Sequence, residues 1–125
     1  MAAILIVEDN PDNMKLFRTL LSLRGHTVTG LSSGDGLPAA LAAGAPDLVL
    51  MDIQLPGKDG FALLADIRGS AQKAVRVVAL TAHAMAGDRD RAIAAGFDGY
   101  ITKPVDIRGF PDQIARALAG EAVTQ

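Results

Sequence analysis

Short apolar runs alternate with helical patterns along this sequence, and that alternation constrains the possible fold more than any other feature. The apolar runs lie at about residues 3–8, 26–31, 47–52, 75–80 and 97–102. Strands that alternate with helices form parallel sheets, because each helix carries the chain back to the start of the next strand. The sequence therefore predicts an α/β fold, a doubly wound parallel sheet of five strands with helices on both faces.

Individual residues indicate where strands and helices lie. The run at 47–52 is apolar between its aspartates and is expected at the centre of the sheet, whereas the mixed run at 26–31 is expected at an edge. Asn10 is expected to cap a helix that begins with Pro11. Asp106 is a candidate cap for the last helix. Pro111 would remove a hydrogen bond from the interior of that helix, which is therefore expected either to start late, near Gly109, or to have an irregular first turn.

Length and composition are those of a single ordinary domain. The 125 residues predict one domain over 1–120 and a loose tail over 121–125. The net charge of −2 without a long basic tract argues against nucleic-acid binding, and no apolar run is long enough for a membrane span. The absence of cysteine and of a basic signal region fits a cytoplasmic protein. If the sequence covers the natural chain, no second domain delivers an output.

Chemically useful residues follow four of the predicted strands. Glu8 and Asp9 follow the first, Asp52 closes the third, Thr81 follows the fourth and Lys103 follows the fifth. The carboxyl ends of parallel strands face the ligand crevice of such folds. Three carboxylates that lie close together repel one another, and a hard divalent cation such as Mg²⁺ relieves that repulsion.

These residues suit phosphoryl transfer. Asp52 follows the most buried strand and is the best candidate for a nucleophile that forms an acyl phosphate. Lys103 and the metal would neutralise charge, and Thr81 would donate a hydrogen bond to a phosphoryl oxygen. Taken singly, each has an ordinary alternative: a solvated strand-end acid, a surface lysine or a threonine that caps a helix.

Four segments of the sequence together resemble the receiver domain (CheY-like) of two-component response regulators. They are Ile6–Asn10, Leu50–Gly57, Ala79–Ala82 and Gly99–Pro104. The resemblance extends from residue 3 to about 119. The amino-acid sequence of residues 10–17 and 51–56 is most similar to that of single-domain DivK-type receivers, although receivers fused to hybrid kinases share similar segments.

The resemblance implies a flavodoxin-like (βα)5 fold with the strand order 2-1-3-4-5. It implies that Asp52 accepts a phosphoryl group from a histidine kinase or a phosphotransfer protein, in a signalling protein rather than an enzyme. Beyond its own Mg²⁺-dependent phosphorylation and dephosphorylation, such a protein catalyses nothing. Glu8, Asp9, Asp52 and the backbone carbonyl of Gln54 would hold Mg²⁺, for which Mn²⁺ can substitute.

The remaining positions of the family pattern also have implied roles. Thr81 and Lys103 would bind phosphoryl oxygens, and the peptide bond between Lys103 and Pro104 would be cis. Tyr100 would swing inward as Thr81 moves, and a partner protein would recognise the face formed by the fourth helix, the fifth strand and the fifth helix. Gln54 and His83 would tune the lifetime of the phosphorylated state.

Two other functions fit the same layout. A small Mg²⁺-dependent phosphatase could use Asp52 as nucleophile, but such enzymes usually need a second acid two residues later, where this chain has Gln54. A flavodoxin-like ligand carrier would share the fold, but the acid cluster and an aromatic content of 4% argue against flavin binding. The leading hypothesis is a phosphoacceptor that signals through protein contacts or within a phosphorelay.

Overall fold

A computed structural model describes residues 2–44, 46–53, 55, 59–70, 74–82, 87–121 and 123–124. Its strands are β1 (Ala3–Val7), β2 (Thr27–Leu31), β3 (Leu48–Asp52), β4 (Arg76–Thr81), β5 (Gly99–Thr102) and β6 (Val123–Thr124). Its helices are α1 (Pro11–Ser22), α2 (Leu37–Ala43), α3 (Gly60–Arg68), α4 (Asp88–Ala95) and α5 (Phe110–Leu118), and a short 3₁₀ helix, η1 (Gly34–Gly36), precedes α2.

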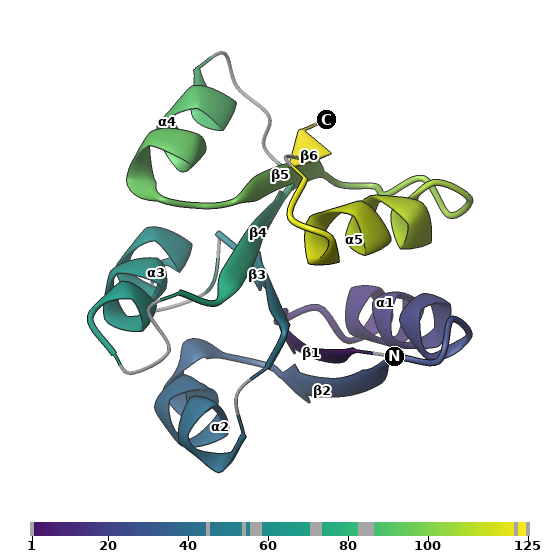
Figure 1. Cartoon of the computed structure of the whole chain (residues 1–125), viewed down its shortest axis with the longest axis horizontal. Coiled ribbons are helices and arrows are strands. Elements are labelled where there is room, and N and C mark those ends of the chain that lie inside the picture. Colours follow the sequence, from purple (N-terminus) through teal and green to yellow (C-terminus); the bar gives the residue numbers. More distant parts are fainter. Residues whose placement is uncertain are drawn as a thin grey trace.

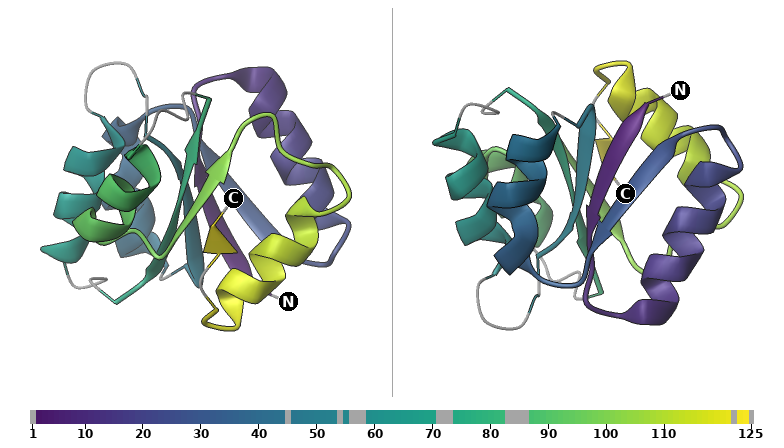
Figure 2. Two further views of the ribbon diagram at one scale, coloured as in Figure 1. Left: turned by 90° about the horizontal axis from the view of Figure 1, so that it is seen from above. Right: turned by 90° about the horizontal axis from the view of Figure 1, so that it is seen from below.

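The strands form one parallel sheet in the order β2-β1-β3-β4-β5-β6. Helices α1 and α5 cover one face of the sheet, and α2, α3 and α4 cover the other (Figures 1 and 2). Every residue of β3 is buried at the centre, whereas β2 is partly exposed at an edge. The predicted α/β class, the doubly wound layout and the order of the first five strands are confirmed.

Each face of the sheet has its own apolar core. Side chains alternate between the faces along a strand, so Ile4 and Ile6 of β1 pack on the α1 and α5 side. Their neighbours Leu5 and Val7 pack on the side of α2, α3 and α4. On the first side, the rings of Phe17 and Phe110 have centroids 5.3 Å apart and join α1 to α5. The two cores fix the strands between them, which positions the strand ends.

The first helix begins as the sequence predicts. The Asn10 side chain accepts hydrogen bonds from the backbone N–H groups of Asp12 and Asn13, at 2.9 and 3.1 Å. Pro11 is the first helical residue, where a missing N–H removes no hydrogen bond from the helix. The cap fixes the direction in which the chain leaves β1, directly after Glu8 and Asp9.

The last helix starts late, as Pro111 requires. It begins at Phe110 after Gly109, so the proline lies in the first turn and removes no helical hydrogen bond. Asp106 does not cap this helix. Its carboxylate accepts instead from the backbone N–H of Arg108, at 3.2 Å, and so stabilises the turn that precedes the helix. A turn and a helix start have the same preference for aspartate, which explains the wrong prediction.

The end of the chain differs from the predicted loose tail. Val123 and Thr124 form β6, which pairs with Gly99 and Tyr100 of β5. A strand of two residues has no periodicity that a sequence can reveal. Residues 83–86, which lie between β4 and α4, are outside the described residues. None of the described helices combines the length and hydrophobicity needed to cross a bilayer.

Candidate functional site

The predicted site residues meet at the carboxyl ends of four neighbouring strands. Glu8 directly follows β1, Asp52 ends β3, Thr81 ends β4, and Lys103 directly follows β5. Because β3 lies between β1 and β4, Asp52 is at the middle of the group. Glu8, Asp52 and Thr81 are almost completely buried, with exposed fractions of 1%, 4% and 0%. Polar groups this deep need hydrogen bonds or charge partners.

Lys103 supplies one such partner to two carboxylates. Its Nζ donates to Glu8 Oε1 at 2.8 Å and to Asp52 Oδ2 at 2.9 Å. The backbone positions this ammonium, because the Lys103 N–H donates to the Thr81 carbonyl oxygen at 2.7 Å. The peptide bond between Lys103 and Pro104 is cis, as the resemblance implied.

Among the described residues, the acids of the site outnumber the bases. Burial raises the pKa of Glu8, against the opposing effects of the Lys103 ammonium and of the Asn10 backbone N–H, which donates to Glu8 Oε2 at 3.1 Å. Burial alone would lower the pKa of Lys103, but its hydrogen bonds to Glu8 and Asp52 outweigh that effect, so the pKa lies above its ordinary value. Lys103 therefore stays charged, and one ammonium serves two buried carboxylates.

A third carboxylate completes a possible cation site. Glu8, Asp9 and Asp52 each offer an oxygen, and these atoms all lie within 4.8 Å of one another. Asp9 is exposed and lies toward solvent. Mg²⁺ prefers oxygen ligands, and among the described side chains one ammonium faces three acids that repel one another. The donor set fits Mg²⁺. The fourth ligand implied by the resemblance, the carbonyl of Gln54, lies outside the described residues, as does His83.

A shallow groove extends from this cluster between α1 and β2. It begins at Glu8 and Asp9, passes Lys15 and Arg18 of α1, and reaches Ser32 beyond β2. Two cationic side chains thus line the same groove as two of the acids. No sequence pattern singles out Lys15 and Arg18, because isolated basic residues on a helix usually face solvent.

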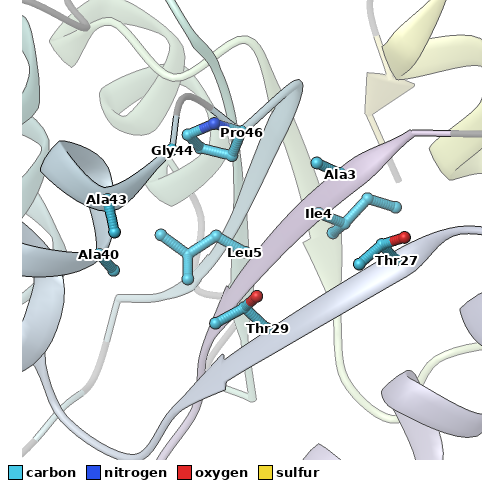
Figure 3. A pocket seen from close by; sticks show the side chains of 9 residues that line it. All are labelled: Ala3, Ile4, Leu5, Thr27, Thr29, Ala40, Ala43, Gly44 and Pro46. Atoms are coloured by element: carbon cyan, nitrogen blue, oxygen red, sulfur yellow. The ribbon is translucent and has the colours of Figure 1, made fainter.

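Another hollow lies at the opposite end of the strands and has a different character. Figure 3 shows it between α2 and the amino ends of β1 and β2, with Ala40 and Ala43 facing Leu5 and Thr29. The short alanine side chains of α2 leave this space over the sheet. Its lining has no ionisable side chain, so it offers no acid–base or metal chemistry.

Tyr100 is buried in β5, next to β4, the strand that ends in Thr81. Only 2% of it is exposed, and it belongs to the apolar core on the α3 and α4 side of the sheet. Ala79 pairs with Tyr100 two residues before Thr81. Burial, with a contribution from Asp88, raises the pKa of the Tyr100 hydroxyl. The ring thus already occupies an inward position in this structure.

Comparison with known proteins identifies the family. Residues 4–115 match the model of the response regulator receiver domain, and the chain belongs to this family. It is 36% identical to the polar-differentiation response regulator DivK of Brucella ovis over 121 residues, which cover 96% of this chain and 98% of DivK. The sensor protein GacS of Pseudomonas syringae pv. syringae is 41% identical over 109 residues. That match covers 84% of this chain but only 12% of GacS.

A solved structure gives the same result. The receiver domain of the sensor histidine kinase PA1611 from Pseudomonas aeruginosa PAO1 superposes with a TM-score of 0.84 and is 32% identical, covering 94% of this chain and 98% of that chain. That crystal structure has a magnesium ion coordinated in its active-site cleft. The chain is thus a receiver domain of two-component signalling, with DivK-like relatives of the same length and with relatives inside sensor kinases. Its family works with histidine kinases and downstream partners.

Proposed function

We propose that this chain is a phosphoacceptor switch whose phosphorylation site is Asp52. The observation that carries the proposal is the position of Asp52. Its carboxylate is buried at the centre of the sheet, 2.9 Å from an ammonium and within 4.8 Å of two further acids. A histidine kinase or a histidine phosphotransfer protein would be the donor, and the groove beside Lys15 and Arg18 offers it an approach.

The reaction is an in-line transfer. An oxygen of Asp52 attacks the phosphorus of a phosphohistidine, the N–P bond breaks, and the histidine nitrogen keeps the electron pair of that bond. The product is an acyl phosphate. Glu8, Asp9 and Asp52, with the carbonyl of Gln54, would hold Mg²⁺, which supplies positive charge to the phosphoryl oxygens when bound. Mn²⁺ would serve in its place.

Residues of the chain supply the remaining interactions. Lys103 already contacts the Asp52 carboxylate, so its ammonium is placed to bind a phosphoryl oxygen after transfer. Thr81, at the end of the adjacent strand, would donate a hydrogen bond to another phosphoryl oxygen. Gln54 and His83 would control the access of water and so set the lifetime of the acyl phosphate. Its slow hydrolysis would reset the switch.

The output surface would be the face formed by α4, β5 and α5. Two of the large apolar side chains that the described residues expose lie on or beside these elements, Ile93 on α4 at 42% and Ile107 just before α5 at 58%. Exposed apolar side chains are typical of protein contact sites. Movement of Thr81 toward the phosphoryl group would stabilise the inward position of Tyr100 and alter this face. The protein would act in the cytoplasm.

Chemical phosphorylation tests the proposal. The chain is incubated with Mg²⁺ and acetyl phosphate, and the acyl phosphate is reduced with borohydride and mapped by mass spectrometry. We expect the label on Asp52 alone. The Asp52→Asn variant should lose it, whereas Asp12→Asn, which removes an exposed acid at the start of α1, should keep it. Undiminished labelling of Asp52→Asn would contradict the proposal.

A further inference from the structure

The chain reverses sharply after α5 and returns to the sheet. Gly120 has a φ of +93°, a conformation that favours glycine. Its N–H donates to the Ala117 carbonyl at 3.1 Å, and the N–H of Glu121 donates to the Arg116 carbonyl at 3.0 Å. These two bonds are those of a Schellman motif, which closes a helix and redirects the chain. The reversal is therefore specified by local structure.

The redirected chain closes an edge of the sheet. Beyond Glu121, β6 pairs in parallel with Gly99 and Tyr100, as the yellow strand beside β5 in Figures 1 and 2 shows. We call Gly120, Glu121 and β6 the C-terminal strap. Among the described strands, only β6 lies outside β5, so without the strap β5 would be an edge strand.

The strap pairs with a strand residue whose side chain has a buried polar atom. The Tyr100 hydroxyl is buried, and no described residue forms a hydrogen bond with it. A buried hydroxyl without a partner loses its hydration and gains nothing in return, which favours rotation of the ring toward water. Apolar contacts oppose that rotation, and so does a strand that keeps β5 away from solvent.

We propose that the C-terminal strap holds Tyr100 in its inward position by closing the outer edge of β5. When the strap detaches, the backbone of β5 loses a neighbour and the ring gains a path to solvent. Within the described part of the chain, the strap and β5 share two ladder pairs, so the strap is expected to open far more often than the core of the sheet. The strap would thus stabilise the output face through a pairing that can open and close.

The closure does not depend on phosphorylation, but its signalling consequence rests on the function proposed above. A partner that adds an extended segment at the β5 edge would have to displace the strap first. The strap would thus restrain the binding of a partner of that kind while it is closed. Measurements without Mg²⁺ or a phosphoryl donor test the closure by itself, so its failure is separable from failure of the phosphoacceptor assignment.

Paired variants at β6 provide the test. The N–H groups of successive strand residues point to opposite edges, so one of Val123 and Thr124 directs its N–H toward β5. The double variant Val123→Pro/Thr124→Pro removes that N–H whichever residue carries it. The matched control, Val123→Ala/Thr124→Ala, keeps both backbone donors. Gly120→Ala is an independent variant, because its φ of +93° strains any residue with a Cβ.

Two measurements report on the strap. Tyr100 is the only tyrosine and there is no tryptophan, so iodide quenching of tyrosine emission reports its exposure alone. Hydrogen exchange followed by mass spectrometry reports on the backbone of β5. We expect the proline variant and Gly120→Ala to show several-fold stronger quenching and several-fold faster exchange at Gly99–Thr102. The alanine control should match the natural chain.

The outcomes show whether the strap holds Tyr100 in place or has no effect on it. Circular dichroism and urea unfolding first establish that each variant is folded. If quenching and exchange in the folded variants equal those of the natural chain, the strap does not hold Tyr100 and the proposal is wrong. If the proline variant does not fold, Gly120→Ala decides in the same way. Equal changes in the alanine control and the proline variant would also overturn it, because backbone pairing would then not be the cause.

Discussion

The Lys103 ammonium lies 2.8 Å from Glu8 Oε1 although 95 residues separate the two in the sequence. Fold topology brings them together: β1 and β5 lie on either side of the β3–β4 pair, and both end at the same edge of the sheet. The ammonium also contacts Asp52, so it takes a place between two carboxylates that would otherwise repel. Lys103 is therefore expected to stabilise the folded chain before any phosphoryl group binds, and unfolding experiments can measure this contribution.

Removal of the ammonium should destabilise the chain. In Lys103→Met, Glu8 and Asp52 lose their shared cation while both stay buried, with side-chain exposures of 0% and 5%. We expect the free energy of unfolding to fall by about 3 kcal/mol. The control is Arg24→Met, which breaks an exposed pair with Asp112 and should cost less than about 1 kcal/mol. Urea unfolding without metal measures both.

The same variant should respond strongly to Mg²⁺. A cation bound by the acid cluster would replace part of the lost compensation, and a ligand that binds only the folded state stabilises it. Saturating Mg²⁺ should therefore restore more stability to Lys103→Met than it adds to the natural chain. An equal Mg²⁺ effect on both proteins would show that Lys103 and the metal do not serve the same carboxylates.

Asp9 should contribute more to metal binding than to stability. It is exposed, in contrast to Glu8 and Asp52, yet it offers an oxygen to the same cluster. Asp9→Asn should weaken Mg²⁺ binding by roughly tenfold, because one of three charged ligands is lost, and should leave the unfolding midpoint without metal almost unchanged. Asp12→Asn, a nearby exposed acid, is the control in the titration. Equal affinity in both variants would exclude Asp9 as a ligand.

Sequence patterns predicted the fold and most of the site because both depend on strand periodicity and strand ends. The residues Glu8, Asp52, Thr81 and Lys103 each follow an apolar run, and parallel strands place such positions at one edge. The features that the sequence patterns did not predict depend on the local path of the backbone. No periodic signal reveals the hydrogen bond from the Asn10 N–H to Glu8 or the return of β6 to β5. The Asp106 side chain stabilises a turn instead of the helix that it was expected to cap.

The stability of the chain should depend on the titration of His26. Its Nδ1 accepts a hydrogen bond from the Ala2 N–H at 3.2 Å, which requires a neutral ring. Burial lowers its pKa below 6.5, with contributions from the N-terminus and Arg24. Between that lowered pKa and 6.5 the unfolded state binds more protons, so this contribution to stability is present above 6.5 and is lost as the pH falls.

His26→Gln removes the titration and keeps a hydrogen-bond acceptor. The natural chain should lose stability relative to this variant as the pH falls from 7 toward 5, because histidine side chains take up a proton in roughly this pH range. Urea unfolding at a series of pH values gives both curves. Parallel curves over that range would show that His26 does not contribute to the pH dependence.

The Arg68 guanidinium should contribute strongly to stability at the end of the sheet opposite the acid cluster. It donates to the carbonyl oxygens of Val75 and Gly96 at 2.6 and 2.8 Å, and to Asp98 Oδ2 at 3.0 Å. It thereby joins the end of α3 to the residues that lead into β4 and β5. Asp98 Oδ2 also accepts the Val77 N–H at 2.8 Å, so one carboxylate stabilises both strand starts.

Arg68→Lys should cost about 2 kcal/mol of unfolding free energy, because a single ammonium cannot reproduce a fork that reaches two carbonyls and a carboxylate. The control is Arg91→Lys on α4, where the guanidinium lies 4.7 Å over the Phe61 ring and the substitution should cost less than about 1 kcal/mol. The labelling of Asp52 by acetyl phosphate should be unaffected in both, since the contacts given above for the two side chains are with residues other than the acids of the site. Loss of labelling in folded Arg68→Lys would instead mean that the two ends of the sheet are coupled.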